Sequence, residues 1–332
     1  MQLKINRKHL KILAVLLAVV LLGTVAFAVL SHWEAQYGTV ANNGTQLSEN
    51  SSLYLNGAYY SQKENLETVL LIGVDKFEDQ IQEQSYNNSQ QADFLALLVM
   101  DRENGRYTVL HLNRDTMTQI QVLGVRGENA GSITGQLALA HTYGSGGTDS
   151  CRNTVEAVSK LLYGVNIDHY IAFTMDAVGK INDLAGGVTL TMLDDLTSIF
   201  PEMQKGERVT LTGDMALAYV RTRYGLEDSS NLQRMERQRQ YLTELSGAIS
   251  EKALTDDTFL MKALEAISTY MTSDCTANQI LQIYDCCKIY VNDGFCTIDG
   301  VAVKGTEFME FYPDETDLKQ LVVELFYTPV EE

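Results

Sequence analysis

The chain has 332 residues, and its 43 Asp and Glu outnumber its 25 Lys and Arg, which gives a formal net charge of -18 at pH 7. Such a chain lacks the broad basic surface that general nucleic-acid binding requires, and we expect no nucleic-acid partner. With 45% hydrophobic residues and three prolines it has a globular composition and can bury a large core. Any site for an anion must therefore be local.

The N-terminus predicts a membrane anchor. Basic residues occur within positions 1–11, and positions 12–30 carry no charge. Nineteen apolar positions span a bilayer core as one helix, and the positive flank places the N-terminus in the cytoplasm. A cleaved signal peptide is the alternative, because "AFA" at 26–28 resembles a cleavage site. The apolar run continues past that site, which favours a retained single-pass anchor in the cell membrane. Both interpretations export the rest of the chain.

Strand patterns follow a polar segment. Residues 31–65 are rich in Asn, Gly, Ser and Gln, as in a spacer, and we expect the extracytoplasmic folded domain over 66–332. Strands are predicted at 67–75, 93–100 and 106–113, the last two joined by "DRENG", a hairpin turn. The strand at 93–100 is apolar throughout, as in the centre of a sheet.

Helices and strands then alternate. A loop and a short helix are expected over 127–147, and an amphipathic helix over 149–164. A strand at 169–174 precedes a helix, a glycine turn and a strand at 175–192. A long amphipathic helix runs from 231 to about 264, and the chain ends in two extended segments and a helix. This alternation implies an α/β fold with a sheet that is covered on both faces.

Five cysteines and five histidines give no clear metal motif. One cysteine is Cys151, and four lie between Cys275 and Cys296. Outside the cell disulfides are allowed, and four cysteines permit three pairings with one thiol left over. A zinc site is the alternative, but CxxC spacing is absent and no histidine lies nearby in the sequence. The histidines show no HxH, HExxH or HxxxH arrangement, so we expect no histidine metal site.

Residues 218–242 concentrate five arginines and no lysine. Arginine presents a planar charged fork that matches phosphate oxygens, whereas lysine is a point charge. Arg221 and Arg223 are two apart, so an extended backbone would point both to one face. A following helix would carry three more candidates on one face: Arg234, Arg237 and Gln238. Two such walls could hold a diphosphate. The alternative is a solvated helix with surface ion pairs, which we favour for Arg239.

Charged residues also stand at the ends of the predicted strands. Asp75 ends the first strand, Asp93 opens the second, and Arg114 and Asp115 follow the third. If these strands are neighbours, Asp75 and Asp93 could share Mg²⁺, which takes one or two carboxylates together with water and substrate phosphate oxygens. Alternatively, Asp93 caps a turn and Arg114 pairs with Asp115.

Seven motifs in order resemble the LytR-CpsA-Psr family over roughly residues 65–250: "LLIGVD", "QADFLALLVM", "LHLNRDT", "AHTYG", "DLAGGVTL", "LTGDMALAYVRTRY" and "RMERQRQYL". The resemblance implies a three-layer α/β/α domain with a mostly buried mixed sheet and a hydrophobic channel for a polyprenyl chain. It also implies a phosphotransferase that moves a glycopolymer, such as teichoic acid or capsule polysaccharide, from polyprenyl diphosphate onto peptidoglycan in a Gram-positive wall.

The resemblance assigns roles to individual residues. Asp75 and Asp93 match metal ligands for Mg²⁺, or for Mn²⁺ in its place. The matches for diphosphate binding are Arg114, Arg221, Arg223, Arg234, Arg237 and Gln238.

Three positions depart from the family pattern or lack a firm match. Gln91 stands where the family has an arginine, and Phe94 where it has a threonine. Lys76 is the stand-in for another family arginine. Asp115 and Asp228 are the candidates for a general base. Because of these departures two other functions stay open: a Mg²⁺-dependent hydrolase of lipid-linked diphosphates, and a non-catalytic module that binds polyprenyl-diphosphate glycans.

Overall fold

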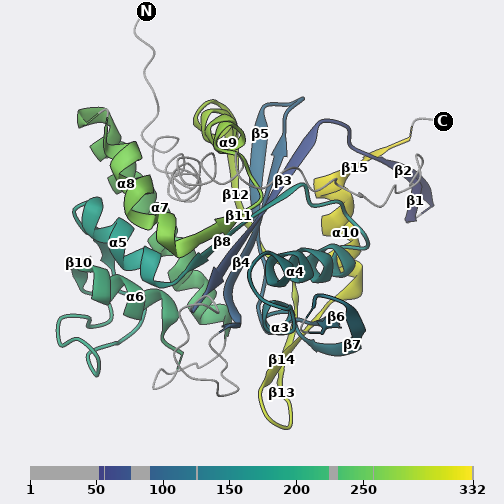
Figure 1. Ribbon diagram of the computed structural model, residues 1–332, viewed down its shortest axis with the longest axis horizontal. Coiled ribbons are helices and arrows are strands. Elements are labelled where there is room, and N and C mark those ends of the chain that lie inside the picture. The colour runs from purple at the N-terminus through teal and green to yellow at the C-terminus, as the bar shows by residue number, and fades with distance from the viewer. Residues whose placement is uncertain are drawn as a thin grey trace, which may run out of the picture.

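A computed structural model describes most of the chain after its N-terminal region (Figure 1). The described residues are 52–55, 57–75, 90–124, 126–223, 231–256 and 258–330. The expected anchor at 12–30, most of the spacer, Lys76 and Asp228 lie outside them. Among the helices of the described part, none has the length and apolarity to cross a bilayer.

The core of the molecule is one six-stranded sheet in the order β11-β8-β3-β4-β5-β12. Its strands are β3 (Leu66–Val74), β4 (Ala92–Asp101), β5 (Arg106–His111), β8 (His169–Thr174), β11 (Met271–Ser273) and β12 (Val291–Cys296). β3 pairs antiparallel with β4 and parallel with β8, so the expected mixed sheet is confirmed. β4 is buried along nearly its whole length, which explains why its sequence is apolar rather than alternating.

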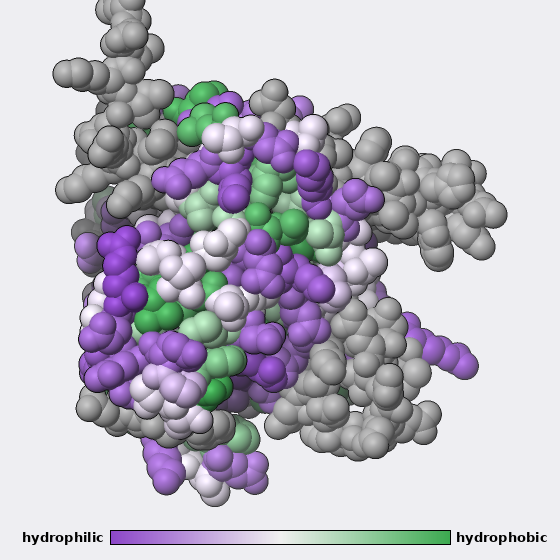
Figure 2. Space-filling model, turned by 90° about the vertical axis from the view of Figure 1, so that its left-hand side faces the viewer, coloured by the Kyte–Doolittle hydropathy of each residue, from purple (hydrophilic) through white to green (hydrophobic). Residues whose placement is uncertain are grey.

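Helices cover both faces of this sheet. Alternate residues of β3 point to opposite faces, with Leu71 in one buried cluster and Ile72 in the other. The Leu71 face packs against α5 (Asp176–Leu184), α6 (Gly213–Arg221), α7 (Asn231–Thr255), α8 (Phe259–Ile267) and α9 (Ala277–Ile289). The other face packs against α3 (Leu139–Thr142), α4 (Gly147–Leu161) and α10 (Glu315–Phe326). The domain therefore has three layers. Figure 2 shows the side occupied by α5 to α8, where apolar patches are bordered by hydrophilic side chains.

Short strands surround the main sheet. They are β1 (Ser52–Leu55), β2 (Ala58–Gln62), β6 (Met117–Leu123), β7 (Asn129–Gln136), β9 (Val188–Thr191), β10 (Arg208–Leu211), β13 (Gly300–Lys304), β14 (Met309–Pro313) and β15 (Tyr327–Pro329). β7 corrects the expectation of a loop there, because its polar, glycine-containing sequence has no apolar alternation. β2 pairs with β15, so part of the expected spacer is folded against the C-terminal end of the domain.

The structure settles the alternatives that the sequence leaves open for the cysteines. All five are free thiols, so none of the allowed disulfide pairings is present. Cys151, Cys275 and Cys287 are buried, so their packing accounts for them without a covalent bond.

Two buried histidines predict that stability falls in mild acid. Burial lowers the pKa of His111 to about 3 and that of His141 to about 4. Because the unfolded value is about 6.5, the unfolded chain binds more protons below that pH, and stability present at pH 7 is lost as the pH falls. Each histidine should cost about 2 kcal/mol between pH 7 and pH 5. Urea unfolding at both pH values measures the change, and His141→Asn should reduce it by about 2 kcal/mol. Equal stability at the two pH values would contradict this account.

Candidate active site

Most of the residues singled out above lie at one end of the strands of the central sheet, which we call the cleft edge. Asp75 follows β3, Gln91 and Asp93 lie at the start of β4, and Arg114 follows β5. Because β4 runs antiparallel to both neighbours, these strand ends meet at the same edge. The edge opens into a cleft of about 1050 Å³. Its walls include Gln91, Asp93, Arg114, Gln136, Ile199, Phe200, Asp214, Leu217, Arg221, Arg223, Arg234, Lys304, Glu307 and Phe308.

Asp93 is the anchor for two arginines of this cleft. Its Oδ1 accepts hydrogen bonds from Arg114 Nη1 at 2.6 Å and from Arg234 Nη1 at 3.2 Å. Gln91 Oε1 accepts from Arg114 Nη2. Burial lowers the pKa of Arg234 to about 10, so this guanidinium stays charged at neutral pH. Two cations are therefore fixed side by side before any ligand binds.

Asp115 positions a third arginine. Its Oδ2 accepts from Arg223 Nη2 at 3.0 Å, and its Oδ1 accepts from Gln136 Nε2 at 3.0 Å. The Asp115 side chain is 3% exposed and is absent from the described walls of the cleft. The expected role as general base is thus corrected, because both oxygens are engaged below the surface. Asp115 instead orients Arg223 toward the cleft.

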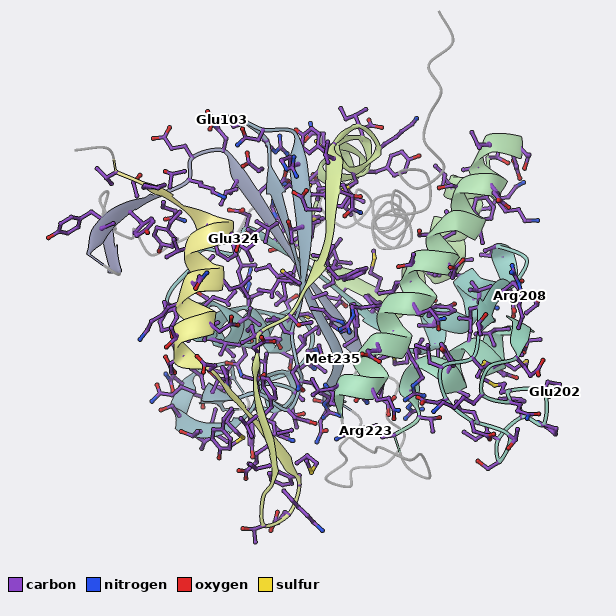
Figure 3. All side chains as sticks on the ribbon, turned by 180° about the vertical axis from the view of Figure 1, so that it is seen from behind. Glu103, Glu202, Arg208, Arg223, Met235 and Glu324 are labelled. Carbon is purple, nitrogen blue, oxygen red and sulfur yellow. The ribbon has the colours of Figure 1, made fainter. Side chains whose placement is uncertain are left out.

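Arg221 reaches the cleft from the helical layer that contains α6. It is the last residue of α6, where it pairs with Asp75, and the chain becomes extended at Thr222. The expected extended backbone through both arginines is therefore only half correct. Thr212 caps the N-terminus of α6, and the following sequence favours a helix up to Arg221. Arg221 and Arg223 nonetheless line the same cleft. Arg223 can be found in Figure 3 below the N-terminal end of α7.

Arg237 and Gln238 do not lie on the described walls of this cleft. Arg237 is 1% exposed, donates to the carbonyl oxygens of Tyr219 (2.9 Å) and Thr222, and lies 3.0 Å from Asp194. Gln238 Nε2 donates to the carbonyl oxygen of Val220 at 3.1 Å. The expectation that both bind diphosphate is corrected, because they serve the otherwise unpaired carbonyls at the end of α6. Arg239 is half-buried rather than fully solvated, and it is not among the described walls of the cleft.

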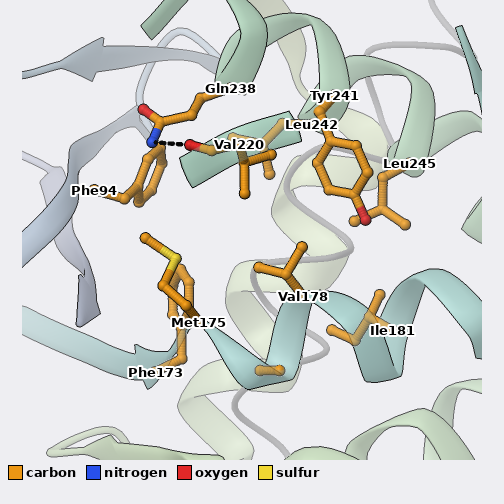
Figure 4. Close-up of a pocket in the computed structure, with 11 residues that line it drawn as sticks. Phe94, Phe173, Met175, Val178, Ile181, Val220, Gln238, Tyr241, Leu242 and Leu245 are labelled. Carbon is orange, nitrogen blue, oxygen red and sulfur yellow. Dashed lines mark hydrogen bonds between the residues drawn. The ribbon is translucent and has the colours of Figure 1, made fainter. Parts of the chain in front are cut away.

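An apolar pocket adjoins the cleft (Figure 4). It is lined by Phe94, Phe173, Met175, Ala177, Val178, Ile181, Val220, Gln238, Tyr241, Leu242 and Leu245. Phe94 directly follows Asp93, and Val220 directly precedes Arg221, so the pocket and the cleft share two walls. The cavity volume is about 50 Å³, room for one or two water molecules. A prenyl chain would have to push these side chains apart.

The carboxylates at this edge suit a hard cation. Asp75 and Asp93 stand at the facing ends of β3 and β4, and both arginine contacts of Asp93 go to Oδ1. Mg²⁺ prefers such carboxylate oxygens and keeps water or phosphate ligands. The residues present therefore fit the metal that the family resemblance implies.

Sequence reasoning missed Gln136, Asp214 and Lys304. Asp214 and Arg221 are seven apart on α6, a helical spacing that could have revealed the shared face. Gln136 ends β7, which was not expected to be a strand. Lys304 ends β13, in the C-terminal third of the chain, and no local pattern places it beside the cleft.

The described part of the chain is thus a three-layer α/β domain in which an arginine-lined cleft adjoins an apolar pocket. Residues 31–325 match the model of the LytR_cpsA_psr family, and the chain belongs to that family.

Relatives agree with this assignment. The protein is 26% identical over 226 residues to the polyisoprenyl-teichoic acid–peptidoglycan teichoic acid transferase TagU of Halalkalibacterium halodurans, covering 66% of this chain and 67% of that one. It is 28% identical to TagU of Bacillus cereus, covering 68% of this chain and 64% of that one. The matched region thus spans about two thirds of these relatives.

Solved structures show the same fold. TagV of B. subtilis superimposes with a TM-score of 0.59 at 22% identity, covering 79% of this chain and 96% of that one. Protein gbs0355 of Streptococcus agalactiae gives 0.61 at 18% identity, covering 78% and 87%.

Proposed function

We propose that this protein is a phosphotransferase that moves a teichoic-acid-type glycopolymer from a polyprenyl diphosphate carrier onto peptidoglycan. The observation that carries the proposal is the cleft lined by Arg114, Arg221, Arg223 and Arg234 next to an apolar pocket. Family membership and the names of the TagU relatives support the same reaction. The uncharged segment 12–30 would hold the protein at the membrane, where its lipid-linked substrate resides.

The chain supplies charge and alignment for this reaction. Phosphoryl transfer is accelerated mainly by neutralising and orienting phosphate oxygens. Arg114 and Arg234 are held by Asp93, and Arg223 by Asp115, so their positive charges are preorganised. Asp75 and Asp93 would hold Mg²⁺, which when bound neutralises further charge on the diphosphate.

Transfer forms one bond to phosphorus and breaks another. A glycan hydroxyl attacks the phosphorus next to the donor glycan, and the bond from that phosphorus to the bridging oxygen breaks. Polyprenyl phosphate leaves with the bonding electrons and needs no added proton. Asp214 is an exposed carboxylate on the wall of the cleft and is placed to accept the proton of the hydroxyl.

Product analysis tests the reaction. Purified full-length protein is incubated with lipid-linked glycopolymer, with and without peptidoglycan. Glycopolymer covalently joined to peptidoglycan is the expected product. Release of free phosphorylated glycopolymer under both conditions would show a hydrolase, and retention of intact substrate would show a binding module.

The apolar pocket predicts a dependence on lipid length. Val178 is partly buried on α5 and lines the pocket, whose volume is only about 50 Å³. Val178→Phe should fill it and lower kcat/KM for a long prenyl carrier by about 10-fold, equivalent to about 1.4 kcal/mol. A carrier with a short prenyl chain should react at the original rate. Leu184→Phe, at an exposed position of the same helix, is the matched control. An equal loss for both carriers would argue against lipid binding in this pocket.

A further inference from the structure

A second group of potential ligands lies at the other end of the strands of the central sheet, away from the cleft. His169 begins β8, and Asp274 and Cys275 follow β11. β8 runs parallel to β3, and the C-terminal ends of both strands lie on the side of the cleft. At about 3.3 Å per residue, the length of β8 separates His169 from the cleft edge by roughly 16 Å. The cluster therefore does not belong to the site described above.

Strand register brings the three side chains together. Ser273 pairs with Ile171 in the antiparallel ladder, so continuing the register sets Cys275 opposite His169. His169 Nδ1 lies 3.6 Å from Asp274 Oδ1. One donor atom from each of His169, Asp274 and Cys275 falls within 4.8 Å of the others. Cys275 is buried while Asp274 is exposed, so the cluster has a closed side and an open side.

Hydrogen bonds fix the backbone that carries the ligands. The Tyr170 N–H donates to Asp274 Oδ1 at 2.9 Å, and Ser273 Oγ donates to the Tyr170 carbonyl oxygen at 2.7 Å. The Cys275 N–H donates to Ser273 Oγ at 3.0 Å. Thr276 then caps α9 with a capping box, which fixes the backbone directly after Cys275. These contacts set the geometry of the cluster in advance.

We propose that His169, Asp274 and Cys275 bind a zinc ion, with water in the fourth position. Nitrogen, oxygen and sulfur donors together suit zinc, whereas Mg²⁺ and Ca²⁺ prefer oxygen alone. Cys275 binds as a thiolate and releases its proton to solvent. The ion would join β8 to the turn between β11 and α9, and the water would leave one coordination position open to exchange. No sequence motif reveals the site, because His169 and Cys275 are far apart in the chain.

Gln279 determines how well His169 can act as a ligand. Its Oε1 accepts from the Thr276 N–H and hydroxyl, and its Nε2 lies 2.9 Å from His169 Nε2. In this arrangement the amide donates to Nε2, which leaves the ring proton on Nδ1, the atom that faces Asp274. Zinc on Nδ1 needs that proton on Nε2 instead. A carboxylate at position 279 could keep the cap and also accept from Nε2.

Zinc titration of the full-length protein tests the site. The reduced protein is stripped with a chelator and titrated with Zn²⁺ against a chromophoric competitor, and Co²⁺ is used to detect thiolate charge-transfer absorption. With excess Mg²⁺ present to occupy Asp75 and Asp93, one tightly bound zinc per chain and a cobalt–thiolate band are expected. Asp274→Asn can keep the bond from Tyr170 and should fold, yet it should weaken zinc binding about 100-fold, as should Cys275→Ser. Absence of zinc binding by the folded parent protein would overturn the proposal.

Matched variants identify the ligands. Asp285→Asn on α9 and Cys296→Ser on β12 lie outside the cluster, and zinc affinity should be unchanged in both. Gln279→Glu should bind zinc about 10-fold more tightly, because its carboxylate orients the imidazole. If the cluster variants bind zinc as tightly as the controls, or if Gln279→Glu has no effect, the assigned coordination is wrong.

Discussion

Replacing Arg114 by alanine is expected to lower the rate of glycopolymer transfer by a factor of about 10²–10³, the usual cost of losing one preorganised donor to developing charge. Arg114 lies on the wall of the cleft with its side chain 8% exposed, held by Asp93 and Gln91. Asp93 keeps Arg234 as a partner after the change, so the fold should persist. The loss should appear mainly in kcat.

Two further variants make this prediction specific. Arg114→Lys keeps the charge but loses the planar fork, so transfer should recover only in part. Arg208→Ala removes an exposed arginine on β10, which Figure 3 shows well apart from Arg223, and should leave transfer unchanged. Steady-state kinetics on all three proteins decides the matter. A folded Arg114→Ala protein with the parent rate would refute a role for this arginine in the reaction.

Arg237→Ala is expected to destabilise the fold by about 3–5 kcal/mol, the range found when one partner of a buried ion pair is removed. Arg237 is 1% exposed and lies 3.0 Å from Asp194, itself 5% exposed. Its guanidinium also serves the carbonyl oxygens of Tyr219 and Thr222. The substitution therefore removes a cation beside a buried carboxylate and two donors from the end of α6.

Urea unfolding measures this loss. Arg239→Ala is the control, because Arg239 stands two positions along the same helix and is half-buried, and its loss should cost about 1 kcal/mol or less. Both variants should show the parent slope with denaturant, since the surface exposed on unfolding hardly changes. If Arg237→Ala unfolds at the parent midpoint, the buried ion pair does not stabilise this domain.

The central sheet could be predicted from sequence because its strands are buried on both faces. The apolar runs of β3 and β4 predict buried strands. The sequence "DRENG" between β4 and β5 predicts a hairpin turn. β7 could not be predicted, because six of its eight residues are exposed and no apolar period remains. Its partner β6 buries Ile120 in the core and pairs with β7 along the main chain.

The site was predictable only to the level of a helix face. Arg234 and Arg237 are three apart on α7, so sequence places them together. Which of them meets a ligand depends on what packs against each one. α6 lies against Arg237 and buries it, whereas Arg234 reaches Asp93 at the sheet edge. Periodicity predicts which residues share a face of a helix, but not which elements pack against that face. Those packing partners give the two arginines different roles.

The C-terminal end of α6 forms a wall that the apolar pocket and the cleft share. Val220 borders the apolar pocket, and the next residue, Arg221, borders the cleft and pairs with Asp75. Gln238 holds the carbonyl of Val220 from behind. Lipid that opens the pocket therefore acts on the same turn of backbone that aims Arg221. A lipid tail that shifted this turn would change the affinity of the cleft for its headgroup, and by reciprocity the headgroup would change the affinity of the pocket for the tail by the same factor.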